Sequence, residues 1–165
     1  MMRMTGCRLY LVCGLPGAGK TRRSHQIVDR VNAVHLCADE WVEGLGRSLV
    51  DYEFRVELQN IVLTHARGLL RSGVSVVVEF GSWSRDERET IRQTAVHEGA
   101  STELHYLDAP LEELVRRVRE RGGPDADALA STVLLQESGA FEAPTPREIA
   151  RFDRYVGPDE EWEAI

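Results

Sequence analysis

Gly14-Leu15-Pro16-Gly17-Ala18-Gly19-Lys20-Thr21 is the stretch that decides the fold of this chain. It matches the phosphate-binding loop pattern, in which two glycines enclose four variable residues and Lys and Ser or Thr follow. Before it, Arg8–Cys13 is a short apolar run typical of a buried strand. After it, Thr21–Arg30 contains neither Gly nor Pro and can continue as a helix. A strand, this loop and a helix in succession are the context in which the motif binds phosphate.

The residue types of the loop predict the chemistry. Glycines allow backbone turns that place successive N–H groups around phosphate oxygens, beside the positive end of the helix. We expect Lys20 to reach the β- and γ-phosphates and the Thr21 hydroxyl to ligate Mg²⁺. A glycine-rich turn that only joins strand to helix is the alternative, and the filled motif positions and both flanks argue against it.

Length and composition limit the number of domains, the expected partners and the expected compartment. The 165 residues suit a single domain spanning residues 1–165. A net charge of −7 gives no general electrostatic help in binding nucleic acid, so nucleic acid is not an expected partner. Three Cys is an odd number without metal-ligand spacing, which favours reduced thiols in a cytoplasmic protein. We expect no membrane span, because no segment reaches about 20 apolar residues, and the sequence does not fix the oligomeric state.

Strand and helix patterns alternate along the rest of the chain. Further strands are expected at 33–37, 74–80 and 102–107, and helices at 20–31, 52–71, 85–97 and 111–121. Between them, 42–51 is expected to be loop or short helix, and His65 to lie on the packed face of its helix. Beyond Pro124 we expect a helix around 129–137, a short helix from 146 to about 152, an edge strand at 154–156 and a fraying acidic tail. The alternation predicts an α/β fold with a parallel sheet and right-handed crossovers.

Asp39 is the candidate general base. It follows the second strand, and α/β sheets bind their ligands at the carboxyl ends of their strands. A carboxylate there can accept the proton of an attacking hydroxyl during phosphoryl transfer. The alternative is that Asp39 caps the next helix. Glu40 is the less suitable base, because two adjacent side chains point in different directions.

Arginines crowd the helix expected at 111–121. Arg117 and Arg121 are four residues apart and can reach one target, such as the charge that develops on a transferring phosphoryl group. Glu113 stands four residues before Arg117, so a surface ion pair is the competing interpretation. We favour a mobile lid over approximately residues 111–138.

The nucleotide is expected to be ATP. The guanine-recognition pattern Asn-Lys-x-Asp is absent, and no strand ends in the Asp-Glu pair of mechanochemical ATPases. Four segments together, GLPGAGKT, ADEW, VVVEF and LDAPLEELVRRVRERG, resemble the P-loop small-molecule kinases. That group includes chloramphenicol phosphotransferase, gluconate kinase, zeta-toxin kinases and the kinase part of polynucleotide kinase.

The resemblance covers roughly residues 8 to 121 and implies a three-layer P-loop kinase fold with strand order 2-3-1-4-5 and a small helical lid. It also implies ATP as phosphoryl donor, Asp39 as base and Arg117 and Arg121 as lid arginines. This chain has Glu79 where many relatives have Asp, and three roles stay open for it: holding a Mg²⁺-bound water, contacting the acceptor, or making a structural hydrogen bond.

An acceptor hydroxyl is expected to enter between the Asp39–Arg47 segment, Glu79–Trp83 and the lid. Trp41 and Trp83 follow two strand ends and are candidates for lining this pocket together with Arg47, with core packing as the alternative for each Trp. The expected reaction is transfer of the γ-phosphoryl of ATP·Mg²⁺ to a small-molecule hydroxyl. The alternatives are a 5′-hydroxyl polynucleotide kinase and a nucleotide-dependent regulatory ATPase.

Overall fold

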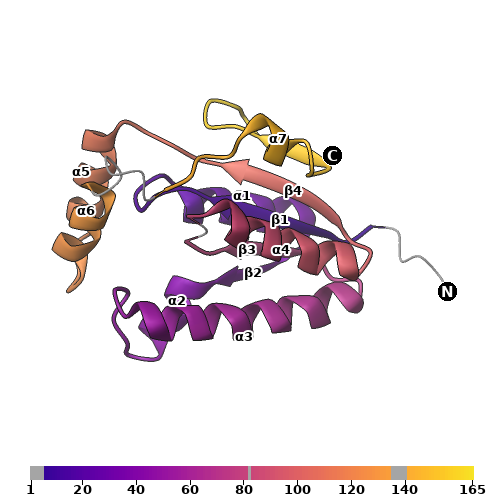
Figure 1. Cartoon of the computed structure of the whole chain (residues 1–165), viewed down its shortest axis with the longest axis horizontal. Helices are drawn as coiled ribbons and strands as arrows, with labels where there is room; N and C mark the ends of the chain where they lie inside the picture. The colour runs from indigo at the N-terminus through magenta and orange to yellow at the C-terminus, as the bar shows by residue number, and fades with distance from the viewer. Residues whose placement is uncertain (1–5, 82, 135–140) are drawn as a thin grey trace.

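The computed structural model describes residues 6–81, 83–134 and 141–165. Five strands form one parallel sheet in the order β2-β3-β1-β4-β5, which confirms the expected fold class and strand order (Figure 1). The strands are β1 (Arg8–Cys13), β2 (Val34–Cys37), β3 (Val76–Glu79), β4 (Ser101–Tyr106) and β5 (Arg154–Val156). The helices are α1 (Lys20–Val31), α2 (Ala38–Gly44), α3 (Tyr52–Arg71), α4 (Arg85–His97), α5 (Leu111–Arg121), α6 (Ala126–Leu134) and α7 (Pro146–Ile149).

Helices cover both faces of the sheet. α1 packs on β1, β2 and β3, whereas α3 packs on β3 and α4 packs on β1 and β4. In Figure 1, α4 lies in front of the sheet and α1 behind it. This division follows from right-handed crossovers: the chain moves one way along the sheet from β1 to β2 and the opposite way afterwards. The strand β3 is buried along its whole length, as its run of Val residues predicts.

Several expected boundaries and environments differ from the structure. β2, β3 and β4 are shorter or shifted by one or two residues. α6 begins at residue 126 and not near 129, and the expected continuation to 137 lies outside the described residues. The packed face of α3 contains Leu58, Val62, Ala66 and Leu70. His65 is therefore exposed, because the packed face is rotated from the one that the periodicity predicted.

The C-terminal tail contacts the sheet through Trp162 and Glu163, which the expectation of a fraying tail did not include. The Trp162 indole N–H donates to Glu103 Oε1 at 2.7 Å, and Arg154 reaches the Glu163 carbonyl at 2.8 Å. Glu103 is fully buried, so the Trp162 N–H and the Arg154 guanidinium, which donates to Glu103 Oε1 at 3.3 Å, offset the cost of burying its carboxylate. The acidic composition of the tail gave no sign of this Trp–Glu contact.

His105 is held neutral in this buried network, because Arg23 can only donate to its Nδ1, at 3.0 Å, while Nε2 faces Glu103 Oε1 at 2.8 Å. Burial lowers the pKa of His105, and the nearby Glu103 opposes this shift only in part. A histidine whose pKa is lower in the folded state stabilises the fold above its unfolded pKa of about 6.5.

We therefore expect the free energy of unfolding to fall as the pH is lowered from about 7 to 5, with a slope from His105 of up to about 1.4 kcal/mol per pH unit. Urea denaturation across this range measures the slope. His105→Gln should flatten it, whatever its effect on absolute stability, and the exposed control His65→Gln should not. Equal slopes for both variants would contradict this role of His105.

All three cysteines, Cys7, Cys13 and Cys37, are free and buried. Within the described residues, no helix combines the length and apolar character that crossing a membrane requires.

Candidate active site

The loop between β1 and α1 has the backbone that the glycine pattern predicts. Gly17 and Gly19 have φ values of 85° and 95°, a region that other residues rarely adopt. A Cβ at Gly17 would also lie 2.8 Å from the Leu114 carbonyl oxygen, so α5 could not pack this closely on a larger residue. The loop therefore requires glycine for its own shape and for its contact with α5.

Lys20 folds back over this loop. Its ammonium donates to the carbonyl oxygens of Gly14 at 2.8 Å and Leu15 at 3.1 Å. Burial lowers the pKa of Lys20, and the negative charges of Asp39 and Glu79 oppose that shift. The two acids that follow β2 and end β3 therefore lie near enough to the loop lysine to affect its pKa.

Glu79 is the buried acid beside Thr21. Its Oε2 accepts from the Thr21 hydroxyl at 3.3 Å and lies 3.3 Å from His35 Nε2. Burial raises the pKa of Glu79, but hydrogen bonds from His35, Cys37 and Thr21 and the charge of Lys20 outweigh it, so the pKa lies below its usual value. The other oxygen, Oε1, is buried and has no hydrogen-bond partner among the described residues.

Asp39 lies in the first turn of α2, where it is held by Arg55 of α3. Arg55 Nη2 donates to Asp39 Oδ1 at 3.0 Å, and Arg55 Nη1 donates to the Leu49 carbonyl at 2.9 Å. The N-cap of α2 is Cys37, and no side chain caps the helix, so Asp39 does not serve as the cap. Arg55 could not be predicted as a site residue, because nothing in the pattern of α3 links it to an acid sixteen residues earlier.

Arg117 makes the ion pair with Glu113 that was the competing interpretation, and it also contacts the phosphate-binding loop. Its Nε donates to Glu113 at 2.8 Å, and its Nη1 donates to the Gly17 carbonyl at 3.1 Å. Arg117 therefore joins α5 to the phosphate-binding loop, and both Arg117 and Arg121 line the cavity. Arg116 pairs with Glu113 and Glu120 on the helix surface instead.

One cavity of about 620 Å³ is lined both by residues of the phosphate-binding loop and by the candidate base and lid arginines. Its lining includes most of the expected site residues, namely Pro16, Gly17, Gly19, Lys20, Thr21, Asp39, Glu79, Trp83, Arg117 and Arg121. It also includes residues that the sequence analysis did not place there, among them Leu49, Tyr52, Arg55, Gln59, Leu129 and Thr132.

Trp41 and Arg47 do not line this cavity, contrary to expectation. The residues from Ala38 onward are helical, so side chains turn by about 100° per residue. Asp39, Glu40 and Glu43 consequently face the cavity while Trp41 is 40% exposed elsewhere. Arg47 lies over the ring of Phe54 and pairs with Asp51.

The segment between α5 and α6 is hydrogen-bonded to the segment that precedes α3. Asp125 accepts from the Ser48 hydroxyl and the Leu49 backbone N–H, both at 3.0 Å. In Figure 1, α5 and α6 lie together beyond the carboxyl ends of the strands. The hydrogen bonds of Asp125 therefore connect this helical pair to residues Ser48 and Leu49, which precede α3.

Asp125→Ala is expected to loosen α5 and α6, because each lost hydrogen bond contributes about 0.5–1.5 kcal/mol. We expect KM for the phosphoryl acceptor to rise by about tenfold, and amides of residues 111–134 to exchange hydrogen faster. Asp127→Ala, an exposed change on α6, is the matched control. Unchanged exchange in Asp125→Ala would show that these contacts do not hold the pair closed.

Comparison with known proteins assigns the family. A family model described as an AAA domain matches residues 9–144. The chain belongs to this AAA domain family.

Two curated relatives of this AAA domain chain are adenylyl-sulfate kinases. The enzyme of Picosynechococcus sp. is 34% identical over 113 residues, and the probable enzyme of Aeropyrum pernix is 31% identical over 113 residues. Each match covers 63% of this chain and 60% of the relative, so the matched region spans about 60% of the length of these relatives.

Among solved structures, a sugar kinase from Janibacter sp. HTCC2649 is similar, with a TM-score of 0.64 and 22% identity. The alignment covers 92% of this chain and 86% of the sugar kinase. At this identity the likeness establishes the fold, and it agrees with the expected resemblance to P-loop small-molecule kinases.

Proposed function

We propose that this protein is an ATP-dependent phosphotransferase that moves the γ-phosphoryl group of ATP to a hydroxyl of a small molecule. The observation that carries the proposal is that the phosphate-binding loop and Asp39 line one cavity of about 620 Å³. A volume of this size suits a small-molecule ligand. The names of the relatives, and the fold that this chain shares with a sugar kinase, support a kinase activity.

The loop binds the triphosphate in this proposal. Backbone N–H groups of the Gly14–Thr21 loop, where Pro16 contributes none, and the N-terminus of α1 bind the phosphates, as they do in other loops of this pattern. Lys20 leaves the carbonyl oxygens of Gly14 and Leu15 and turns to the β- and γ-phosphates. Lys20 thereby exchanges two neutral carbonyl acceptors for negatively charged phosphate oxygens. The hydrogen bonds to the charged oxygens are stronger, which favours this movement of the side chain.

Thr21 and Glu79 fit a Mg²⁺ ion. A hydroxyl and an ionised carboxylate are the hard oxygen donors that Mg²⁺ prefers. The buried, unpartnered Oε1 of Glu79 supports this assignment, because such an atom costs stability unless a ligand or water uses it. When bound, Mg²⁺ neutralises charge on the β- and γ-phosphate oxygens.

Asp39 acts as the general base. It accepts the proton of the acceptor hydroxyl while the new oxygen–phosphorus bond forms and the bond between the γ-phosphorus and the bridging oxygen breaks. ADP leaves with the electron pair of that broken bond. Arg55 holds the Asp39 carboxylate in one orientation through Oδ1, which leaves Oδ2 for the acceptor.

Arg117 and Arg121 offset negative charge on the transferring group. Both line the cavity from α5, which packs directly on the loop at Gly17. Arg117 then exchanges the Gly17 carbonyl for a phosphoryl oxygen. Trp83 and Arg55 line the part of the cavity in which the acceptor is proposed to bind.

A panel of acceptors tests the proposal. Purified protein with ATP and Mg²⁺ is assayed for ADP release with adenylyl sulfate, sugars, nucleosides, aminoglycoside- and phenicol-like alcohols and 5′-hydroxyl oligonucleotides. The proposal expects one small-molecule class to increase ADP release and to yield a phosphorylated product. Slow hydrolysis that no acceptor changes would instead indicate a regulatory ATPase, and selective phosphorylation of the oligonucleotide would indicate a polynucleotide kinase.

A further inference from the structure

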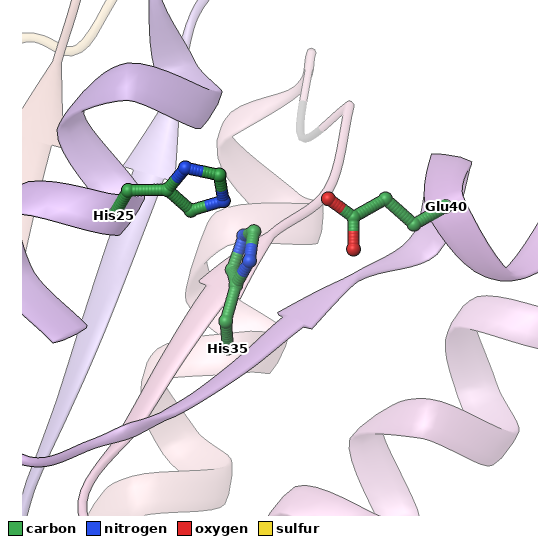
Figure 2. Close-up of side chains that lie close together, drawn as sticks. All are labelled: His25, His35 and Glu40. Atoms are coloured by element: carbon green, nitrogen blue, oxygen red, sulfur yellow. The ribbon is translucent and has the colours of Figure 1, made fainter.

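Three potential metal ligands meet beside the candidate active site. His25 of α1, His35 of β2 and Glu40 of α2 place one ligand atom each within 4.8 Å of one another (Figure 2). In Figure 2, the Glu40 carboxylate extends toward the two imidazole rings. Glu40 also lines the 620 Å³ cavity, but neither histidine does, so the phosphotransferase proposal gives neither ring a direct contact with nucleotide or acceptor.

The ligand types suit a transition metal and not Mg²⁺. Two imidazoles and a carboxylate form a three-ligand set of the kind that binds Zn²⁺ and leaves a fourth position open. Metal–ligand bonds of about 2.0–2.2 Å place tetrahedral ligand atoms roughly 3.3–3.6 Å apart. The atoms here need to approach by no more than about 1.5 Å, and the exposed side chains of His25 and Glu40 can do so by rotating about their χ angles.

The surroundings position His35 for this role. Its Nε2 lies 3.3 Å from the buried Glu79 carboxylate. A carboxylate that accepts from one nitrogen of a ligating imidazole fixes the ring and makes its other nitrogen a better ligand. The His25 and His35 rings are 5.3 Å apart and nearly perpendicular, at 87°, so their faces are not stacked against each other.

A second set of possible ligands shares His35 and adds Cys37 and Glu79. Both added residues are buried, and Glu79 already accepts from Thr21 and lies against His35. An ion reaches the set that contains His25 and Glu40 without opening the core, because these two residues are exposed.

We propose that His25, His35 and Glu40 bind one divalent transition-metal ion of the zinc class. The site is distinct in ligand chemistry from the proposed Mg²⁺ position at Thr21 and Glu79. His35 connects the two positions, because the same imidazole contacts Glu79.

Titration of metal-free, nucleotide-free protein tests this site. Zn²⁺ binding is measured by calorimetry, and Co²⁺ binding by the visible absorption of the bound ion. We expect one ion per chain in each case. His25→Ala and Glu40→Gln should each weaken binding by about tenfold or more, a loss comparable to that from removing metal-supporting groups elsewhere. The exposed control His65→Ala should bind as the unmodified protein does.

Three results would overturn the proposal: no saturable binding, unchanged affinity in both His25→Ala and Glu40→Gln, or a thiolate-to-cobalt absorption band that assigns the ion to Cys37. Circular dichroism of each variant confirms that it is folded, which the exposure of both positions favours. These experiments measure metal affinity alone. If the metal-site proposal fails, the phosphotransferase proposal is therefore unaffected.

Discussion

Asp39→Asn is expected to lower the rate of phosphoryl transfer by about 10²–10⁴-fold, the range that a general base contributes. Asn cannot accept the acceptor proton, but its amide oxygen can still accept the hydrogen bond from Arg55 Nη2. The position of α2 should therefore be retained. Since the phosphates contact the loop and not Asp39 in this proposal, we expect nucleotide affinity to change by less than about threefold.

Two measurements on the same protein separate these effects. Calorimetric titration with a non-hydrolysable ATP analogue and Mg²⁺ reports binding, and single-turnover transfer to the acceptor found in the panel reports chemistry. Asp29→Asn, an exposed change on α1, controls for loss of one negative charge. If Asp39→Asn transfers phosphoryl at the rate of the unmodified protein, Asp39 is not the base.

Glu148→Ala is expected to destabilise the fold by about 3–5 kcal/mol, because it leaves a buried charge without its main partner. Arg88 of α4 is fully buried and binds both carboxylate oxygens of Glu148 of α7, at 2.6 and 2.9 Å. Glu148 is itself buried, so water cannot replace it. This pair fixes the C-terminal segment to the helix that follows β3.

Urea denaturation measures the loss, with Glu57→Ala on the exposed surface of α3 as the control, expected within about 0.5 kcal/mol of the unmodified protein. The double change Arg88→Met with Glu148→Leu should recover most of the stability, because apolar pairs of similar volume often replace buried ion pairs without loss. A loss below about 1 kcal/mol for Glu148→Ala would contradict a buried, water-excluded pair.

Local patterns in the sequence predicted the elements closest to the phosphate-binding loop. The bounds of β1, α1, α3, α4 and α5 match the expected ones, because apolar periodicity and capping residues define them. Ser84 and Glu87 form the expected capping box of α4. Asp39 could be placed at the cavity because the carboxyl ends of parallel strands lie at one edge.

Contacts between distant segments could not be predicted in this way. The pairs Asp39–Arg55, Ser48–Asp125 and Glu103–Trp162 depend on how helices and tail pack, and no short spacing encodes them. Trp41 was misplaced for a related reason. Its position after a strand suggested the pocket, but the helical turn that begins at Ala38 directs it away.

A structure of the protein with Mg²⁺ and a non-hydrolysable ATP analogue tests the central claim most directly. We predict the β-phosphate within the amides of the Gly14–Thr21 loop, Lys20 released from the Gly14 and Leu15 carbonyls, and the γ-phosphate facing the Asp39 carboxylate across the cavity. A γ-phosphate that points away from Asp39, or a nucleotide bound outside this cavity, would contradict the proposed transfer.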